Sequence, residues 1–442
     1  MAGERGINFP YAEKFGAIAP ALPGAGVPWL DRRRREAIER FRDLGLPSVR
    51  VEEWKYTSLR GLAKTAFAPA IAEPLAIEAE RLTAHLPGRF AAPGLVFVNG
   101  ALRSDLSAPG GLPPGVRLAG LASQLKAAPE TLEGEVGRLA PVNGEALIAL
   151  NTALMTDGYL LEIDDGITLD APVHLVFFGG AGEARPAWHM RNIIRLGAKS
   201  RATVVESHVG IASDDVYWSN PVSEVTLGRG AFLRHYKLQE ESHGASHLAH
   251  AKVALAAESR YENFAFTVGG GLSRNEIDVR FEGEGADCHL DGVFLLSARQ
   301  HADTTTVIDH AVPHCTSREV YKGVLDGRAH GVFQGRITVH PQAQKSDGHQ
   351  FCRALLLSDK AEIDIKPELE IYADDVKCGH GATVGELDKE ALFYLQSRGI
   401  DQQRAQNLLI EGFLNEVLER VTFAPVLDRM ITTASAWLNE RI

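Results

Sequence analysis

Short runs of alternating apolar and polar residues fill the middle of the chain, from about residue 156 to residue 371. Glycines and small polar residues separate these runs, and no long helical periodicity is present there. Alternation with a period of two is typical of β-strands that bury one face. The middle of the chain is therefore predicted to be mainly β.

A loose repeat runs through this region: an apolar pair precedes a turn rich in Gly, Ala or Ser, and a second apolar strand follows. It is visible in IIRLGAKSRATVV, VTLGRGAFLRHY, VALAAESRYENF, VRFEGEGADCHLDGV and LLLSDKAEIDI. Aligning Leu196, Leu227, Leu255 and Phe281 gives steps of 31, 28 and 26 residues, the size of stacked β-solenoid coils. An antiparallel sandwich has similar turn signals, so periodicity alone gives the β-helix and the sandwich equal weight.

The N-terminal third combines helix and strand patterns. A helix is predicted from Pro28 to Leu44, because proline suits the first turn and apolar residues share one face. Shorter helices are predicted within residues 70–88 and 121–140, around an apolar strand, residues 95–98, that ends at an Asn-Gly turn. We expect a small mixed domain over residues 1–150.

Helical periodicity returns after Gly385. One helix is predicted over residues 387–395 with its end at Gly399, a second is capped by Asp401, and a third starts near Pro425. These helices are expected to form a bundle, which could cap the open end of the β-core. The predicted domains are residues 1–150, a β-core of residues 151–385 and a C-terminal helical domain of residues 386–442.

The composition is that of a folded protein, with 45% apolar and 23% charged residues. A net charge of -11 argues against a nucleic-acid groove or an anionic membrane surface as the main partner. No stretch of about 18 uninterrupted apolar residues occurs, and the N-terminus lacks an apolar signal segment. We therefore expect a cytoplasmic protein that binds neither nucleic acid nor membrane.

Several common catalytic signatures are missing. No Gly-Lys dipeptide occurs, so a P-loop is excluded, and the GxSxG and HExxH patterns are also absent. The four cysteines, Cys288, Cys315, Cys352 and Cys378, lie more than 25 residues apart. This spacing excludes a CxxC zinc motif and favours reduced thiols. Two groups of histidines have spacings that fit surface loops as well as metal ligands. They are His243, His247 and His250, which would align along a helix, and His301, His310 and His314.

The segment ADDVKCGHGATVG, residues 373–385, carries the strongest candidate site. In an extended strand Cys378 and His380 point to the same side, where a thiolate and an imidazole can reach one iron, zinc or copper ion. The flanking Gly379 and Gly381 are expected to let another chain or a cofactor approach closely. Two ligands do not close a metal site, so a partner would have to supply the rest. The alternative is a buried cysteine and a hydrogen-bonded histidine without a ligand role.

The run PELEIYADDVKCGHGATVGELDKEALFYLQSRGI, residues 367–400, resembles the signature of the SufB/SufD family of iron-sulfur assembly proteins. The resemblance extends upstream through RNEIDVRFEGEGADCHLDGVFL, QHADTTTVIDH and YKGVLDGRAHGVFQGRITV to EEWKYTSLRGL, residues 52–62. SufB proteins usually carry a CEHE-type segment where this chain has Cys-Gly-His-Gly. The chain therefore resembles the SufD branch of the family.

This resemblance implies a right-handed parallel β-helix flanked by N-terminal and C-terminal helical regions. It implies a heterodimer with a SufB-like subunit, in which Cys378 and His380 are transient ligands for iron or a nascent cluster shared with that partner. It also implies a non-enzymatic scaffold that docks a SufC-like ABC ATPase through its C-terminal helices. The expected docking residues are Leu392, Phe393, Tyr394, Arg398 and Gly399. The sequence leaves open whether a flavin binds and whether a homodimer forms without the SufB-like subunit.

Two other functions compete with this interpretation. Solenoids often present carboxylates in a groove that cleaves glycans, and Asp303, Asp309 and Glu319 are candidates for such a carbohydrate-active enzyme. In the second alternative, the chain is a purely structural partner of a SufB-like subunit and contributes no ligand.

Overall fold

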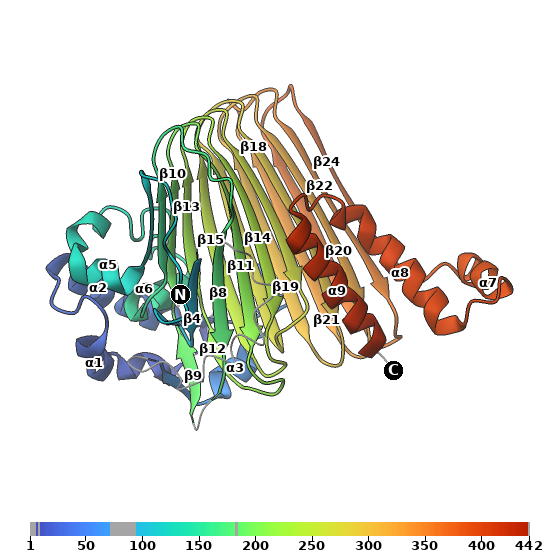
Figure 1. Cartoon of the computed structure of the whole chain (residues 1–442), viewed down its shortest axis with the longest axis horizontal. Helices are drawn as coiled ribbons and strands as arrows, with labels where there is room; N and C mark the ends of the chain where they lie inside the picture. Colours follow the sequence, from blue (N-terminus) through green and yellow to red (C-terminus); the bar gives the residue numbers. More distant parts are fainter. Residues whose placement is uncertain (1–5, 8, 71–93, 182–183, 441–442) are drawn as a thin grey trace.

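Two curved sheets run along the long axis of the molecule and form the walls of a solenoid (Figure 1). The structure is a computed structural model, and it describes residues 6–7, 9–70, 94–181 and 184–440. Sheet 1 contains β6 (Val116–Gly120), β7 (Tyr159–Ile163), β10 (Arg191–Leu196), β13 (Val222–Leu227), β15 (Ser246–Leu255), β17 (Leu272–Phe281), β19 (His301–His310), β21 (His330–Val339) and β23 (Glu362–Ile371). Sheet 2 contains β5 (Ala101–Leu102), β4 (Gly94–Val98), β8 (Val173–Gly179), β11 (Arg201–Gly210), β14 (Phe232–Glu240), β16 (Arg260–Thr267), β18 (Asp287–Leu296), β20 (Thr316–Leu325), β22 (Asp347–Leu356) and β24 (Lys377–Gly385).

From β13 onwards the chain crosses from one sheet to the other with each strand. Neighbouring strands along each sheet are parallel, except for the antiparallel pairs β6–β7 and β4–β5 near the start. The result is a parallel β-solenoid of about eight turns, which confirms the β-helix and excludes the antiparallel sandwich. Short strands β3 (Phe67–Pro69), β9 (Arg185–Trp188) and β12 (Trp218–Ser219) pair beside sheet 1, and β1 (Gly6–Ile7) pairs with β2 (Leu46–Pro47).

The four positions aligned in the sequence are direct neighbours in sheet 1. Leu196 pairs with Leu227, Leu227 with Leu255, and Leu255 with Phe281. All four side chains are buried in the interior of the solenoid. The steps between them differ because the turns between strands differ in length while the register of the strands is kept.

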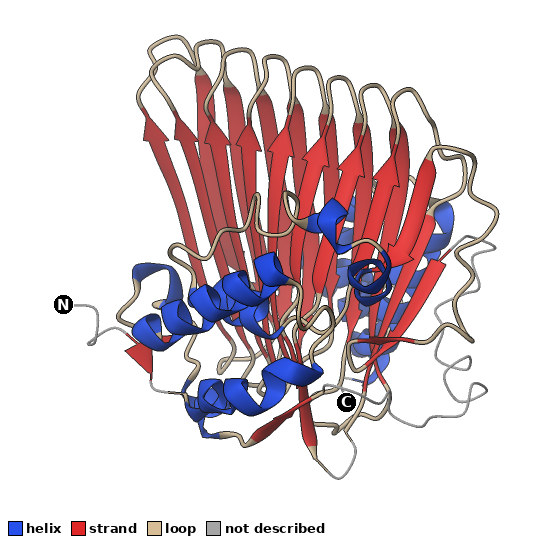
Figure 2. Ribbon diagram, turned by 90° about the vertical axis from the view of Figure 1, so that its left-hand side faces the viewer, coloured by secondary structure: helices blue, strands red, loops and turns tan. Residues whose placement is uncertain are grey.

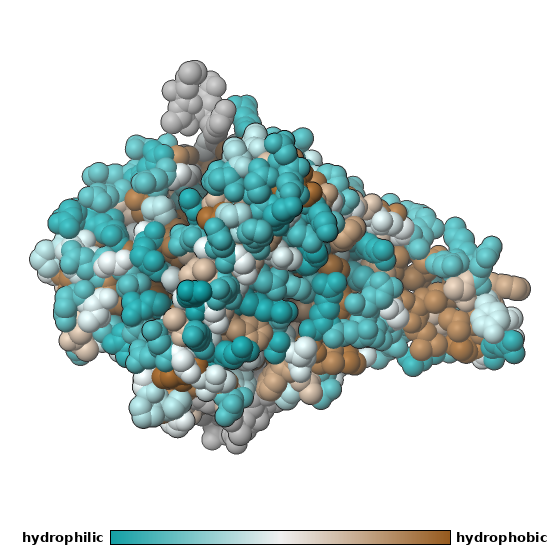
Figure 3. All heavy atoms as spheres, turned by 90° about the horizontal axis from the view of Figure 1, so that it is seen from above, coloured by the Kyte–Doolittle hydropathy of each residue, from teal (hydrophilic) through white to brown (hydrophobic). Residues whose placement is uncertain are grey.

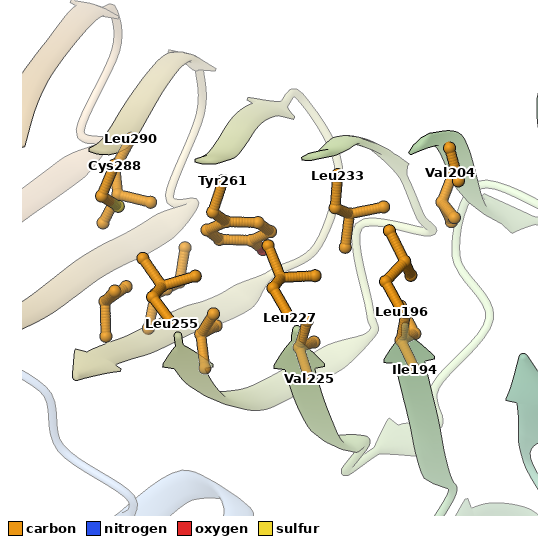
Figure 4. Close-up of a cluster of buried hydrophobic side chains, with 14 of the residues drawn as sticks. Ile194, Leu196, Val204, Val225, Leu227, Leu233, Leu255, Tyr261, Cys288 and Leu290 are labelled. Atoms are coloured by element: carbon orange, nitrogen blue, oxygen red, sulfur yellow. The ribbon is translucent and has the colours of Figure 1, made fainter. Parts of the chain in front are cut away.

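Inward-facing side chains from the two sheets meet along the solenoid axis. Figure 4 shows Val225 and Leu255 of sheet 1 opposite Leu233 and Tyr261 of sheet 2. Successive residues of a strand point to opposite faces, so every second residue contributes to this interior and the others face outward. The inward row of sheet 2 continues through Cys288 towards the last strand, β24.

Part of the interior is polar and internally paired. The Lys237 Nζ atom is 2.8 Å from His247 Nε2 and 2.5 Å from Asn275 Oδ1. Burial lowers the pKa of Lys237 to about 8, although the carboxylates of Glu206 and Glu241 act in the opposite direction. The solenoid therefore holds buried charges that balance one another.

Two helical layers cover opposite outer faces of the solenoid, the N-terminal one in front and the C-terminal one behind in Figure 2. The N-terminal layer packs on sheet 1, where Leu248 joins its apolar cluster. It contains α1 (Phe15–Ile18), α2 (Pro28–Leu44), α3 (Arg60–Lys64), α5 (Leu121–Ala127) and α6 (Ala146–Leu154), with the 3-10 turns η1 (Pro10–Lys14), η2 (Ala19–Ala21), η3 (Glu52–Trp54) and η4 (Pro129–Leu132). Helices α8 (Gln402–Leu418) and α9 (Ala424–Glu440) pack on Tyr236 and Phe264 of sheet 2.

The helix predicted from Pro28 to Leu44 is confirmed at both ends as α2. Residues 121–140 contain α5 and η4, as expected, and strand 95–98 is found as β4. The helix predicted within residues 70–88 lies almost wholly outside the described residues. Across the described ranges, no helix has both the length and the apolar character needed to span a membrane.

The three C-terminal helices are also confirmed: α7 (Lys389–Ser397), then α8, whose first turn is capped by the Asp401 carboxylate at 3.0 Å from Arg404 N, then α9. The C-terminal helical region is therefore confirmed, but α8 and α9 pack on an outer face of the solenoid and not over its open end, which was one of the roles considered for them. Helices α8 and α9 lie along sheet 2 because its outward-facing apolar side chains need cover. Strands β4 and β6 join the sheets from before residue 151, and the division at residues 150 and 385 stays a prediction.

Residues 52–57, here called the strap, cross the outer face of sheet 1. The guanidinium of Arg274 lies 4.2 Å from the ring centre of Trp54. Thr57 donates to the carboxylate of Asp303, and Lys366 on β23 forms an ion pair of 2.6 Å with Glu52. The strap therefore ties the N-terminal layer to several successive coils, including the last coil of sheet 1.

Candidate functional site

Cys378 and His380 lie on β24, the last strand of sheet 2, which pairs with β22 on one side only. In register, Cys378 lies beside Gly348 and His380 beside Gln350. Both side chains lie on the same side of the strand, as predicted, and this is the interior side, because their row continues the buried positions Cys288 and Leu290. The rise of a strand places their Cα atoms about 7 Å apart.

The two glycines beside His380 do not open the site as expected. Gly379 and Gly381 belong to the opposite, outward-facing row of β24, because residues alternate across a strand. A Cβ atom on Gly379 would lie 3.0 Å from the His349 ring, and one on Gly381 would lie 2.7 Å from the Phe351 ring. The glycines therefore make room for two aromatic rings of the neighbouring strand.

The electrostatic environment of Cys378 favours a neutral thiol in the isolated chain. Its thiol is about half buried, and burial raises its pKa. A backbone hydrogen bond from Gly348 and the Arg318 guanidinium lower this pKa, while the Asp347 carboxylate raises it. Asp347 is itself held by Arg318 at 3.0 Å. A bound cation would favour the thiolate, so metal binding at Cys378 would release a proton.

The pair does not complete a metal site within this chain. Among the described residues, no group of three His, Cys, Asp or Glu ligand atoms close enough to hold an ion includes Cys378 or His380. Directly behind the pair, Gln350 is fully buried and donates from Nε2 to the Glu368 carbonyl at 3.0 Å. Cys352, the next inward residue of β22, is also fully buried. Further ligands for an ion on the open side of β24 must come from outside the described residues.

Exposed apolar side chains gather at the same end of the molecule. Figure 3 shows brown surface concentrated towards the end from which α7 projects. Six of the eight large apolar side chains that are exposed in the described residues lie on the last coils or on α7. They are Phe351, Ile371, Tyr372, Val384, Phe393 and Tyr394. An apolar surface beside two unpaired strand edges is typical of an interaction site.

Helix α7 projects from the body of the molecule and buries none of its residues (Figure 1). Phe393 is 72% exposed and Tyr394 is 57% exposed, and the Arg398 guanidinium lies 5.2 Å from the Tyr394 ring centre. Gly399 adopts a φ of +85° where the helix ends, a conformation that favours glycine. Leu392 lines a cavity of about 700 Å³ between α7, the end of β24 and the turn after β22.

Comparison with known proteins identifies the family of the chain. Residues 177–413 match the family model described as the SUF system FeS cluster assembly, SufBD core domain, and residues 10–175 match the SufBD protein N-terminal region. The chain belongs to the SufBD family. It is 30% identical to the iron-sulfur cluster assembly protein SufD of Escherichia coli over 390 residues, 87% of this chain and 88% of that protein.

Other relatives also match over most of the chain. An iron-sulfur cluster assembly SufBD family protein of Synechocystis is 31% identical over 408 residues, 91% of this chain and 89% of the relative. Protein ABCI7, chloroplastic, of Arabidopsis thaliana is 28% identical over 429 residues, 95% of this chain and 88% of that protein. The resemblance found in the sequence to this family, and to SufD within it, is confirmed.

The carboxylates proposed for glycan cleavage do not share a groove. Asp303 is buried on the outer face of β19, where Arg274 and Thr57 hold it. Asp309 forms an ion pair of 2.7 Å with His340, while Glu319 is fully buried inside the solenoid. A pair of carboxylates on either side of one glycosidic bond is therefore not formed by these residues.

The histidine groups are also rearranged by the fold. His247 and His250 lie on β15 and not on a helix, so their spacing of three places them on opposite faces. His247 points inward, 2.9 Å from the Glu241 carboxylate, whereas His250 points outward beneath the N-terminal layer. Sequence reasoning missed Asp347 beside Cys378, although its place in the DGHQ run, with His349 two residues later, was a usable signal.

Proposed function

We propose that this SufBD-family chain is a SufD-like, non-enzymatic scaffold subunit that pairs with a SufB-like subunit and helps iron enter a nascent iron-sulfur cluster. The observation that carries the proposal is the position of Cys378 and His380. They lie on the terminal strand of the solenoid, on its interior side, at an edge that no other strand of the described residues covers. Iron and the nascent cluster are here cargo of the assembly.

The open end supports pairing with another solenoid. Strands β23 and β24 are the last strands of sheets 1 and 2, so each has a row of backbone groups that no strand in the described part of the chain pairs with. A related subunit with the same coil geometry can continue both sheets and cover the exposed Val384 and Ile371. Such pairing would place ligands of the partner next to Cys378 and His380.

The ligand chemistry supports transient iron binding. A thiolate and an imidazole both bind ferrous iron and iron-sulfur clusters. The raised pKa of Cys378 means that the free chain keeps a neutral thiol, which binds metal weakly. Affinity would rise when the partner adds ligands, and the cargo could leave again when the two subunits separate.

Helix α7 supports the docking of a SufC-like ABC ATPase. Its Phe393 and Tyr394 side chains are large, apolar and exposed, and aromatic residues of this kind dominate protein interfaces. ATP binding in the docked subunit would act on α7 and on the adjoining end of β24 across the 700 Å³ cavity that Leu392 and Val384 line.

The test compares the Cys378→Ala/His380→Ala variant with the unchanged chain after co-expression with a SufB-like subunit and a SufC-like ATPase. We expect the complex to form as before but to lose most of its iron and sulfide, measured per complex by chemical analysis and by visible absorption. The matched control is Cys315→Ala/His340→Ala, which removes a buried thiol and a surface imidazole that do not belong to β24.

Each outcome decides between two roles. Lost loading with an intact complex supports a ligand role for the pair. Intact loading with an intact complex contradicts it and favours a purely structural partner of the SufB-like subunit. If the complex itself does not form, the single variants Cys378→Ser and His380→Gln, which keep polar side chains of similar size, repeat the comparison.

A further inference from the structure

A second polar cluster lies on the outer face of sheet 1, far from β24 in the strand order. His250 and Lys252 of β15 are in register with Glu276 and Asp278 of β17, so the four side chains form a square on neighbouring strands. Glu145, the residue before α6, faces the square from the N-terminal layer.

Glu145 occupies the N-cap position of α6, yet its side chain does not cap the helix. Its Oε1 atom instead lies 2.6 Å from Lys252 Nζ, while its Oε2 atom has no hydrogen-bond partner in the described part of the chain. Glu145 therefore contacts the square through one carboxylate oxygen, and its other carboxylate oxygen points towards His250.

His250 is 4% exposed, and its Nδ1 atom also has no hydrogen-bond partner among the described residues. This atom is 3.7 Å from Glu145 Oε2 and 3.8 Å from Glu276 Oε2. These separations are too long for hydrogen bonds. They are close to the spacing of two ligands on one ion, about 3 to 3.5 Å when each metal bond is about 2.1 Å. The three ligand atoms all lie within 4.8 Å of one another.

Around the cluster the carboxylates outnumber the cations, even with Arg336, which lines the same cavity. Lys252 pairs with Glu145 and Asp278, while Arg274 pairs with Glu276 and Asp303. These ion pairs therefore join four carboxylates to only two cations. A buried excess of negative charge favours a bound cation.

The cluster is reachable from solvent. It lines a cavity of about 540 Å³ between the N-terminal layer and sheet 1, bordered on the far side by Trp54 of the strap and by Arg336. The Glu145 side chain is 39% exposed, so an ion and its remaining water ligands can enter beside it.

We propose that Glu145, His250 and Glu276 form a binding site for one divalent first-row transition-metal ion, separate from Cys378 and His380. Two carboxylates and one imidazole suit zinc, manganese or ferrous iron, and three protein ligands leave coordination positions for water in the cavity. Lys252 and Arg274 hold the two carboxylates in place from the sides. The ion joins α6 to β15 and β17 and so links the N-terminal layer to the solenoid.

The test uses the full chain carrying Cys378→Ala/His380→Ala, so that metal binding at β24 makes no contribution. Chelator-treated protein is titrated with Zn²⁺ by calorimetry and with Co²⁺ by visible absorption. We expect one bound ion per chain. His250→Ala and Glu276→Gln should each weaken binding about 100-fold, and Zn²⁺ should raise the unfolding temperature only where the site is intact.

The matched controls are His340→Ala and Glu282→Gln, which change the same residue types elsewhere on the surface. Circular dichroism confirms that each variant is folded, and Glu276→Gln keeps the size of the side chain. Equal binding by the unchanged site and by both ligand variants overturns the proposal, as does the absence of any bound ion. Neither result affects the role proposed for Cys378 and His380, which is tested by cluster loading.

Discussion

Glu319 shows what burial does to one carboxyl group in this fold. It points into the solenoid from β20, between Leu290 and Gln350 in register. Neither carboxyl oxygen makes a well-formed hydrogen bond to a described residue. Burial raises the pKa of Glu319 to about 8, with a small further rise from Asp291, although Thr306 lowers it slightly. At neutral pH the folded state therefore favours the protonated acid.

We predict that Glu319→Gln stabilises the protein increasingly as the pH rises. In the unfolded chain the carboxyl ionises near its usual pKa of 4.5, whereas in the folded chain it resists ionisation up to about pH 8. The unchanged protein therefore has its full stability below about pH 4.5 and loses stability as the pH rises from there to about 8. Glu319→Gln has no carboxyl group to ionise and does not lose this stability. The free energy of unfolding of the variant, measured in urea at pH 8.5, should therefore exceed that of the unchanged protein by a few kcal/mol.

Glu282→Gln, in an exposed turn, provides the control, and its difference from the unchanged chain should stay small at every pH. A pH-independent difference for Glu319→Gln would contradict the expected environment of this carboxyl group. Glu319 lies one strand from Gln350 and two strands from His380 in the same row of sheet 2. Measuring cluster loading with Glu319→Gln therefore also tests whether protonation of Glu319 affects that loading.

At the residue scale, the sequence predicted that Cys378 and His380 share one face of a strand, as the structure has them, but it did not predict their surroundings. Strand periodicity is enough to place Cys378 and His380 on one face. It also places Gly379 on the other face, but only the structure shows that His349 fills the space beside it. Leu255 lies five residues after His250, and Phe281 lies five residues after Glu276. The sequence alignment of Leu255 with Phe281 therefore also aligned His250 with Glu276. Glu145 could not be found, because a contact between layers leaves no local pattern.

At the scale of elements, α7 differs from the helices beside it. Helices α8 and α9 have buried faces that pack on sheet 2, whereas α7 has none. A nine-residue helix gains little stability from its own hydrogen bonds, so α7 depends on its Asp388 cap, its Gly399 end and contacts with α8. Such a helix presents side chains to a partner at little cost to the fold.

We predict that Phe393→Ala/Tyr394→Ala abolishes most binding of a SufC-like ATPase without lowering the unfolding temperature. Both side chains are exposed, so the fold loses few contacts, whereas an interface would lose two aromatic anchors worth about 2 kcal/mol or more each. Binding is measured by calorimetry or by co-purification. Ile431→Ala on α9, also exposed, is the matched control.

A variant of α7 that binds the ATPase with unchanged affinity would contradict the proposed docking surface. The three C-terminal helices themselves were predictable, since capping residues and apolar periodicity mark each of them. The surface on which these helices pack was not predictable, because amphipathic helices can cover either sheet 2 or the open end of the solenoid. In the structure they cover sheet 2, whose outward-facing apolar residues, such as Phe264, pack against them.

For the whole molecule, the two ends of the solenoid are unequal. At the first coils, antiparallel strands β5 and β6 end the sheets, and the N-terminal layer packs beside them. At the last coils, β23 and β24 are parallel strands with free edges and exposed apolar side chains. The chain therefore has one end suited to continuation by another subunit.

We predict that Val384→Glu weakens association with a SufB-like subunit by at least about tenfold, because it places a charge in the interface that covers β24. Val384 is 48% exposed, so the isolated chain should unfold at nearly the same temperature as before. Affinity is measured with purified subunits. Ile431→Glu on α9 is the control, and an equal effect of both variants would argue against an interface at β24.

The contacts of the strap constrain the order in which parts of the chain can fold. Glu52 and Lys366 are separated by 314 residues, and Gln334 on β21 donates to the Glu53 carbonyl at 3.1 Å. During synthesis the strap leaves the ribosome long before β21 and β23 exist. Closing a contact over so many residues is slow, and it becomes available only when the last coil of sheet 1 is in place. Chains cut short before β23 will therefore lack the contact between Glu52 and Lys366, and the start of their strap will be held less firmly than in the full chain, whereas Trp54 and Thr57 can still bind to β17 and β19.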